Sequence, residues 1–557
     1  MGLNGRTGSK VLQEPTAEGI VRFEHEAKAQ MDRRNICRIL EMTRGHMPFV
    51  TKSSQTSRLT PSPTNESLPA SLTMESKTHT LIGRASSLAK ALLATTLLSA
   101  PAFAGQATSE APSSTPLADW WNGKYMTGNW FGVRDTLAEH GLAFSGKWEG
   151  DFFGILDSKN GARGVFDQEV NFKGDVDFAK LTGLDSLKGL VAFGEVRYRQ
   201  PLSPNANPAT YIGATSMFNP SHFQSGTQWR LTNFGVGYTT PELFGIKNFL
   251  GVRGGWLQPS KEFAIQPLAQ LFVNNAINSS RGIGGNIQWS SSYSAWGGTL
   301  QVKPTSDLYA KGGLFLAMPM GTATSNHGLA FEGYGPDTSR NGVMAVTELG
   351  YTPKFGENKL PGKYAVGGYF FGVDSPTYNG QTAQGQYGFY FQADQMIFRE
   401  ASAEPAPMGK GPSDGKAVAS AGKSFKQAIP PTNPALNDQG LSAFNMVSFT
   451  PSYVVANRIP FYFQTGLVYK GLIPTRDKDQ TMVALGFGSY NYNAIDNLQH
   501  AGNVNQPNYS AVIEGGYRVQ INEWAYFQPF IQYIIKPNGT GDVQNATILG
   551  FSTALLF

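Results

Sequence analysis

Polar and apolar residues alternate along much of this chain with a period of two. In segment 166–178 one face is apolar and the other is polar: Phe166, Val170, Phe172, Val176 and Phe178 against Asp167, Glu169, Asn171, Lys173, Asp175 and Asp177. Segments 143–155, 509–520 and 525–535 repeat the pattern, with aromatic residues on the apolar face. Such alternation is typical of half-buried β-strands.

The alternation predicts sixteen strands, at residues 143–155, 166–178, 188–199, 228–239, 248–257, 295–304, 308–318, 342–352, 363–374, 386–398, 444–455, 460–471, 480–489, 508–520, 524–535 and 545–557. Segment 283–290 is left out, because an outer-membrane barrel with both termini in the periplasm has an even number of strands. The tight links 304–307 and 521–523 then lie on the periplasmic side. The long segments lie outside: 200–227, 258–294, 319–341 and 490–507.

Two connections depart from the rule of short periplasmic turns and long outer loops. Segment 399–443 is long and rich in Pro, Gly, Ala, Ser and Lys, yet it falls on the periplasmic side. We interpret it as a flexible insertion. The link 456–458 is short, although it falls on the outer side.

The C-terminal segment distinguishes a membrane barrel from a soluble sandwich, which would give the same local alternation. The chain ends with Leu549, Phe551, Leu555 and Phe557 on one face. A closing strand that ends in Phe is typical of outer-membrane barrels, and no segment reaches the roughly 18 apolar residues of a helical span. The predicted fold class is therefore all-β, a transmembrane antiparallel β-barrel of 16 strands.

An export signal is predicted from Met74 to Ala104. Its basic region contains Lys77, Arg84 and Lys90, and its apolar region spans 91–100. The cleavage site is Ala102-Phe103-Ala104. Residues 1–73 are interpreted as an over-extended N-terminus, the alternative being a long leader. The mature chain would begin at Gly105, with an N-terminal segment 105–142 followed by the barrel, 143–557.

Charge and cysteine content change once residues 1–104 are set aside. The whole chain has 45 Lys and Arg against 40 Asp and Glu, and residues 1–104 hold 13 and 8 of these, which leaves 32 of each sign. Nucleic-acid binding therefore has no electrostatic support. The single cysteine, Cys37, lies in the part set aside, so neither a disulfide nor a thiolate metal site is expected. No cofactor is expected either.

Two helical segments are predicted beside the strands. One spans 130–140, between Asn129 as N-cap and Gly141 as C′ residue, at or inside the periplasmic mouth. The other follows Pro267 in the third outer loop, 258–294, with Leu268, Leu271, Phe272 and Ala276 along one stripe. We expect this loop to fold inward and narrow the lumen, the alternative being a helix that caps the outside.

Charged side chains of both signs point into the predicted lumen. The expected pore constriction comprises Glu195, Arg197, Arg199, Arg253, Lys147, Glu149, Asp151, Glu514 and Arg518, with Glu169 also inward. Guanidinium and carboxylate groups bind neutral hydroxyls and still allow fast release, as passage of a sugar requires. The alternative is that these charges pair across the wall and hold its shape. Arg230 points outward by alternation from Phe234 and Val236, unless a bulge intervenes.

Several segments resemble carbohydrate-selective porins of the OprB type. TGNWFGVRDTLAEHGL (127–142) is similar to the family's T-G-x-W-G-G-x-R-x-x-L-x-x-x-G-I entry motif. Segment 249–276 resembles its R-x-G followed by D/E-F and F-x-N, and segments 466–480 and 527–539 resemble its closing strands. The departures are Phe131 where the family prefers Gly, Gly255-Trp256 after the R-x-G, and the insertion 399–443.

The resemblance covers most of residues 120–557 and implies a porin in the outer membrane of a Gram-negative bacterium. Small sugars would be its permeating solutes, outer-membrane lipid would surround it, and nucleic acid would not be a partner. Both a monomer and a homo-oligomer such as a trimer stay open.

Other classes of protein fit less well. The histidines after Ala104 are His140, His222, His327 and His500, and none lies on a predicted strand facing a serine, so a hydrolase triad is unsupported and no enzyme is expected. A siderophore-type receptor needs about 22 strands and a plug, more than 453 residues supply. An adhesin would leave the inward charges unexplained. The alternative function is therefore a general diffusion porin for small hydrophilic solutes and ions.

Overall fold

The computed structural model describes residues 116–158, 160–201, 208–214, 218–223, 228–289, 293–317, 342–400, 438–502 and 506–557. The predicted signal peptide and the residues before it lie outside this part of the chain, as do His327 and nearly all of the insertion 399–443, so the expectations made for them stay predictions. Within the described ranges, no helix is long and apolar enough to cross a membrane.

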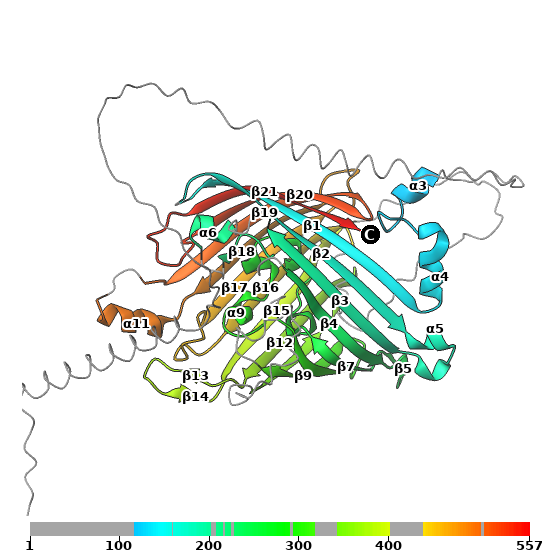
Figure 1. Ribbon diagram of the computed structural model, residues 1–557, viewed down its shortest axis with the longest axis horizontal. Coiled ribbons are helices and arrows are strands. Elements are labelled where there is room, and N and C mark those ends of the chain that lie inside the picture. Colours follow the sequence, from blue (N-terminus) through cyan, green and yellow to red (C-terminus); the bar gives the residue numbers. More distant parts are fainter. Residues whose placement is uncertain are drawn as a thin grey trace, which may run out of the picture. The chain divides into compact units, whose positions relative to one another are not determined.

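Sixteen long strands of the described chain form one antiparallel sheet that closes on itself. They are β1 (Leu142–Asp157), β2 (Arg163–Asp177), β3 (Leu190–Pro201), β4 (Gln228–Thr239), β7 (Leu250–Leu257), β8 (Ala295–Val302), β9 (Leu308–Ala317), β10 (Gly342–Tyr351), β12 (Leu360–Phe371), β15 (Gln386–Arg399), β16 (Gly440–Phe449), β17 (Phe461–Lys470), β18 (Gln480–Ser489), β19 (Tyr509–Asn522), β20 (Ala525–Ile535) and β21 (Ala546–Leu556). Each strand pairs with the next, and β1 pairs with β21 to close the barrel (Figure 1). The predicted barrel of 16 strands is confirmed.

Short elements occupy the links between these strands. The helices are α5 (Phe178–Thr182), η2 (Asp185–Leu187), α6 (Pro208–Ile212), α7 (Pro259–Glu262), η4 (Ala269–Leu271), α8 (Asn275–Asn278), α9 (Arg281–Gly284) and α11 (Tyr492–His500). The small strands are β5 (Glu242–Leu243), β6 (Ile246–Lys247), β11 (Lys354–Phe355), β13 (Ser375–Pro376) and β14 (Thr382–Ala383). The described part of segment 283–290, residues 283–289, belongs to such a link and not to the wall, as predicted.

Strand boundaries differ most from the prediction at β16. The strand begins at Gly440 and ends at Phe449, several residues earlier than predicted. Pro451, two residues after Phe449, cannot donate a hydrogen bond to a sheet ladder, which accounts for the early end. The link to β17 therefore spans 450–460, and the prediction of a short link at 456–458 was wrong.

The barrel wall is apolar outside, whereas its inner face carries most of the charged residues as well as apolar residues that pack against L3. On β10, Leu349 is 61% exposed while its neighbour Glu348 is 4% exposed. Large apolar residues such as Val366 and Phe389 likewise face outward on adjoining strands. This arrangement suits a wall that meets lipid, where the closed ladder also satisfies every backbone group.

The N-terminal segment contains α3 (Pro116–Trp121), η1 (Trp130–Gly132) and α4 (Val133–Glu139). The predicted helix 130–140 is interrupted, because Phe131 and Gly132 have positive φ, so α4 begins only at Val133. The backbone N–H of Met126 donates to the carbonyl of Leu556 at 2.7 Å. The segment therefore lies at the end of the barrel where β1 begins and β21 ends (Figure 1). Apart from the link between β15 and β16, the links at this end are short, which is typical of the periplasmic end of an outer-membrane barrel.

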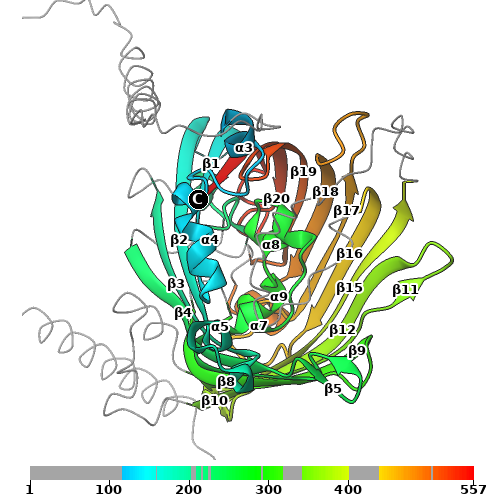
Figure 2. The same cartoon turned by 90° about the vertical axis from the view of Figure 1, so that its right-hand side faces the viewer.

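The third outer loop, residues 258–294 and called L3 from here on, carries α7, η4, α8 and α9 in place of the one helix predicted after Pro267. The backbone turns extended at Phe272, and Asn274 then caps α8 by accepting from the N–H of Ala276. Leu268, Phe272 and Ala276 are buried in a cluster with wall residues such as Phe444 and Tyr462. Figure 2 shows α7, α8 and α9 within the ring of strands.

Candidate functional site

A cavity of about 420 Å³ lies between L3 and the inner face of β1, β2 and β3. Its polar lining from the wall comprises Ser145, Lys147, Glu149, Glu169, Asn171, Lys173, Arg197 and Arg199, together with Gln464 of β17. Its polar lining from L3 comprises Ser260, Lys261, Gln266, Gln270, Asn275, Asn278, Ser279, Ser280 and Arg281, and His222 contributes from the link before β4. Hydrogen-bond donors and acceptors thus surround the space on both sides.

Alternation along β3 places Arg197 and Arg199 on the inner face, and the register with β2 places Glu169 opposite Arg199. One carboxylate oxygen of Glu169 lies 2.5 Å from Nε of Arg199, and the other lies 3.3 Å from Nε of Arg197. A single carboxylate therefore orients both guanidinium groups. The contact with Arg199 is a charge-assisted hydrogen bond, one of the stronger kinds in proteins, and the contact with Arg197 is an ion pair.

Glu195 connects the same arginines to L3. Its Oε1 accepts from Nη2 of Arg197 at 3.1 Å, from Nδ2 of Asn171 at 2.6 Å and from Nζ of Lys261 at 2.5 Å. Burial lowers the pKa of Lys261 to about 7, although Glu195 acts in the opposite direction. The ammonium group of Lys261 lines the cavity, whereas Glu195 sits behind it.

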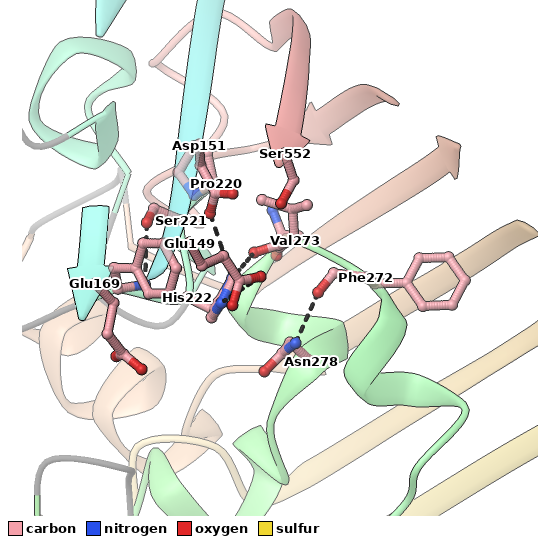
Figure 3. A network of polar contacts seen from close by, with 12 residues as sticks. Glu149, Asp151, Glu169, Pro220, Ser221, His222, Phe272, Val273, Asn278 and Ser552 are labelled. Atoms are coloured by element: carbon pink, nitrogen blue, oxygen red, sulfur yellow. Dashed lines mark hydrogen bonds and ion pairs between the residues drawn. The ribbon is translucent and has the colours of Figure 1, made fainter. Parts of the chain in front are cut away.

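A second cluster of polar side chains surrounds Glu149 on β1, beside L3 (Figure 3). Glu149 accepts from Lys147 and, at 2.7 Å, from the hydroxyl of Tyr526. A ring nitrogen of His222 lies 3.9 Å from Glu149, and the other lies 3.7 Å from Asp151. Burial lowers the pKa of His222, although Glu149 acts in the opposite direction. Strand alternation could not find His222, because it lies in a link.

The predicted constriction residues therefore separate into two groups. Lys147, Glu149, Arg197 and Arg199 line the cavity, with Glu195 directly behind them. The other predicted residues, Arg253, Asp151, Glu514 and Arg518, are not part of the lining. Three of these four hold L3 in place.

Arg253 donates from Nη1 to Oε1 of Glu262 in L3 at 2.7 Å. Glu514 accepts from the backbone N–H groups of Val273 and Asn274 at 2.8 and 2.7 Å. Arg518 donates from Nη2 to the carbonyl of Leu271 at 3.2 Å. These side chains point inward as predicted, but they contact the loop instead of the open cavity.

A bulge in β4 resolves the orientation of Arg230. The register with β3 pairs Glu195 with Asn233 but Val196 with Leu231, so Thr232 is an extra residue. The alternation shifts by one position beyond it, as expected for a bulge. Arg230 therefore faces inward, opposite Arg197, and is 7% exposed.

Sequence reasoning missed several residues that fix L3. Glu348 on β10 accepts from the N–H of Ala264 at 2.9 Å and from the hydroxyls of Tyr309 and Tyr390 at 2.8 and 2.7 Å. Lys311 on β9 donates to Glu262 at 2.9 Å. The alternation of both strands already pointed these charges inward, but nothing local in the sequence marked them as partners of L3.

Among the described residues, no group of three or more His, Cys, Asp or Glu side chains is placed so that it could bind a metal ion. What the site offers is a set of fixed donors and acceptors around a small space inside a membrane barrel. The fold and this lining define an outer-membrane porin, a class of channels and not of enzymes.

Comparison with known proteins gives the family. The model of the carbohydrate-selective porin, OprB family, matches residues 165–557, and the chain belongs to that family. Porin B of Pseudomonas aeruginosa is 24% identical over 457 residues, covering 78% of this chain and 92% of that protein. The high-pH structure of Pseudomonas putida OprB is similar in fold, with a TM-score of 0.63 and 21% identity over 78% of this chain and 99% of that one. The predicted family and outer-membrane location are confirmed, and the protein is a sugar porin in the general sense.

Proposed function

We propose that small sugars enter the periplasm by passive diffusion through the cavity beside L3, and that Arg197, Arg199 and Glu169 form the part of the constriction that selects them. One observation carries this proposal: two guanidinium groups, oriented by one shared carboxylate, face the polar edge of L3 across the cavity. Lys147, Glu149 and Lys261 complete the lining nearby.

The chemistry of this lining suits a neutral, hydroxyl-rich solute. A sugar that reaches it exchanges water for charged hydrogen-bond partners, a net gain of about 1–3 kcal/mol for each contact. The free energy of binding stays small enough for the sugar to be released, which passive flux requires. The cavity volume of about 420 Å³ falls within the range of roughly 300–1,000 Å³ that is usual for small-molecule sites.

A general diffusion porin is the second candidate, and one observation favours it. Arg197 contacts both Glu169 and Glu195, so its charge is already balanced within the wall. Under this alternative the ion pairs hold the shape of the barrel, and solutes of equal size pass at equal rates.

The two candidates differ in what happens when the arginines are removed. The double variant Arg197→Ala with Arg199→Ala is expected to weaken sugar block of the ion current about tenfold or more, since two charged contacts are lost. Its conductance should rise, because the narrow point becomes wider. Planar-bilayer recordings with graded sugar concentrations measure both quantities. The matched control replaces Lys188 and Lys478, exposed cations of the periplasmic links.

Liposome swelling with sugars and amino acids of equal size provides the second measurement. The wild-type protein should pass sugars faster, and the double variant should lose that preference. If the double variant keeps wild-type sugar affinity, Arg197 and Arg199 do not select sugars, and the protein is better described as a general diffusion porin.

A further inference from the structure

We propose that Glu514 is a positioning residue that holds the apex of L3, residues 273–275, and thereby sets the width of the constriction. The effect on sugars rests on the function proposed above, whereas the position of the loop can be tested without any sugar. Glu514 lies on the inner face of β19 and is fully buried, at 0% exposure.

Both carboxylate oxygens of Glu514 are used by the backbone of L3. Oε1 accepts from the N–H of Val273 at 2.8 Å, and Oε2 accepts from the N–H of Asn274 at 2.7 Å. Within the described part of the chain its remaining hydrogen-bond donor is Nε2 of Gln532, at 3.2 Å, and no cation pairs with it. Burial of an ionised carboxylate is costly unless hydrogen bonds compensate. Here the compensation comes from the loop itself.

Gln532 on β20 extends this contact to a second loop. Its Nε2 also donates to the carbonyl of Pro220 at 3.1 Å, and its Oε1 accepts from Nδ2 of Asn274 at 3.0 Å. Segment 218–223, which contains Pro220, therefore shares one buried polar network with the apex of L3.

Segment 218–223 also contacts the apex directly. The N–H of Asn275 donates to the carbonyl of Asn219 at 3.1 Å, and a ring nitrogen of His222 lies 3.2 Å from the carbonyl of Val273. Figure 3 shows His222 beside Val273, between the wall and the loop. The apex is thus hydrogen-bonded both to a carboxylate of the wall and to a neighbouring loop.

The position of the apex determines where the polar edge of L3 lies. Asn275, at the end of the apex, lines the cavity, as do Asn278 and Ser279 shortly after it. Nδ2 of Asn278 donates back to the carbonyl of Phe272 at 2.7 Å, so this stretch moves with the apex. A displacement of the apex would therefore change the gap between L3 and the arginines of β3.

Only a carboxylate meets the two neighbouring N–H groups with two acceptors. A glutamine at position 514 would offer one acceptor oxygen and would turn its NH₂ group toward the other N–H. Glu514→Gln keeps the size of the side chain but removes one of the two acceptors for the N–H groups of Val273 and Asn274. Glu514→Asp keeps both acceptors on a shorter side chain.

A cysteine reporter measures the position of L3 directly. Gln270 is exposed, lines the cavity and lies in L3, and Cys37 is the single cysteine of the full sequence. With Gln270→Cys in place, the reporter is modified by the anionic reagent sulfonatoethyl methanethiosulfonate during single-channel recording, in otherwise wild-type protein and in each variant at position 514. Glu523→Gln, on an exposed periplasmic link, is the matched control.

We expect Glu514→Gln to change the modification rate by about threefold or more and to increase open-channel current noise, since a loosely supported loop samples more positions. Glu514→Asp should lie nearer to wild type, and Glu523→Gln should match it. Wild-type rate and noise in Glu514→Gln would overturn the proposal. A changed rate with unchanged sugar block would support the positioning role and count against the sugar selectivity proposed above.

A second variant covers the case in which Glu514→Gln gives no folded barrel. Gln532→Met removes the side-chain contacts to Asn274, Pro220 and Glu514 but leaves both hydrogen bonds from the backbone of L3 to Glu514. It should shift the modification rate in the same direction by a smaller amount. A wild-type rate in Gln532→Met, with Glu514→Gln unfolded, would also overturn the proposal.

Discussion

Arg253 on β7 and Glu262 in L3 form a buried ion pair, with 2.7 Å between Nη1 of Arg253 and Oε1 of Glu262. Nζ of Lys311 on β9 lies 2.9 Å from the other oxygen of Glu262. The three charges tie the beginning of L3 to two strands of the wall. Arg253, which the sequence assigned to the constriction, therefore contacts L3 and anchors this loop to the wall.

This pair predicts the effect of Glu262→Gln. The substitution leaves Arg253 and Lys311 buried without their counter-charge, and breaking a buried pair in this way costs about 3–5 kcal/mol of unfolding free energy. Guanidinium unfolding in detergent, followed by heat-modified mobility on gels, measures the loss. The control is Glu523→Gln, which breaks an exposed pair with Lys478 and should cost less than about 1 kcal/mol. Equal midpoints for the two variants would contradict the anchoring role of Glu262.

Close packing of L3 on the wall predicts the effect of Gly282→Ala. A Cβ atom at position 282 would lie 1.9 Å from Oγ of Ser448 and 2.6 Å from Cβ of Tyr462. The Cβ of Tyr462 is fixed by its backbone, so α9 must move away from β16 and β17. Overpacking of this kind costs about 1–3 kcal/mol, and the displaced loop should change single-channel conductance.

The matched control for that substitution is Gly312→Ala on β9, where a Cβ atom would meet nothing within 4 Å. Its unfolding midpoint and conductance should equal those of the wild type. If Gly282→Ala behaves in the same way, L3 does not pack against β16 and β17 as described.

The bulge at Thr232 predicts opposite outcomes for two single-residue deletions. Deleting Thr232 removes the extra residue and leaves Arg230 facing the lumen, so the barrel should still assemble. Deleting Val236 shifts the regular ladder, and Arg230 and Asn233 would then face lipid. A lipid-facing Arg costs about 2–4 kcal/mol near the midplane of the membrane.

Heat-modifiable mobility of outer-membrane fractions tests this pair of deletions. The Thr232 deletion should give a folded band, and the Val236 deletion should give little. The opposite result would show that Thr232 is required for pairing of β3 with β4.

Asp479, in the periplasmic link before β18, predicts a pH dependence of stability. Burial by itself would raise its pKa, but hydrogen bonds from Tyr517, at 2.6 Å, and from Arg476, at 2.7 and 3.0 Å, hold the pKa below its ordinary value. A depressed pKa stabilises the folded state above the unfolded-state pKa, which is about 3.9. The stabilisation is lost as the pH falls through the folded-state pKa.

Comparison with Asp479→Asn isolates this contribution. The wild type should unfold at higher guanidinium concentration than the variant near neutral pH, and the difference should shrink below about pH 4. Asp477→Asn, which changes an exposed residue of the same link, is the control and should show no such trend. A difference that is constant down to acid pH would exclude the ionised carboxylate as its source.

The alternation of polar and apolar residues is enough to predict the barrel. Lipid outside and water inside impose a period of two on every strand, and this pattern is local, so strand number, inward faces and the closing Phe557 could all be read without knowing any long-range contact. The same alternation identified Arg197 and Arg199 as inward residues, and the structure places both in the cavity.

Which inward charges remain open to the cavity depends on contacts between segments that lie far apart in the sequence. Glu348 and Glu514 contact L3 from positions 84 and 241 residues away, and no local pattern encodes such a meeting. The fold of L3 depends on these wall contacts, so the single helix expected after Pro267 was wrong. Likewise, the bulge at Thr232 turns Arg230 inward, because one extra residue in a strand inverts every side chain beyond it.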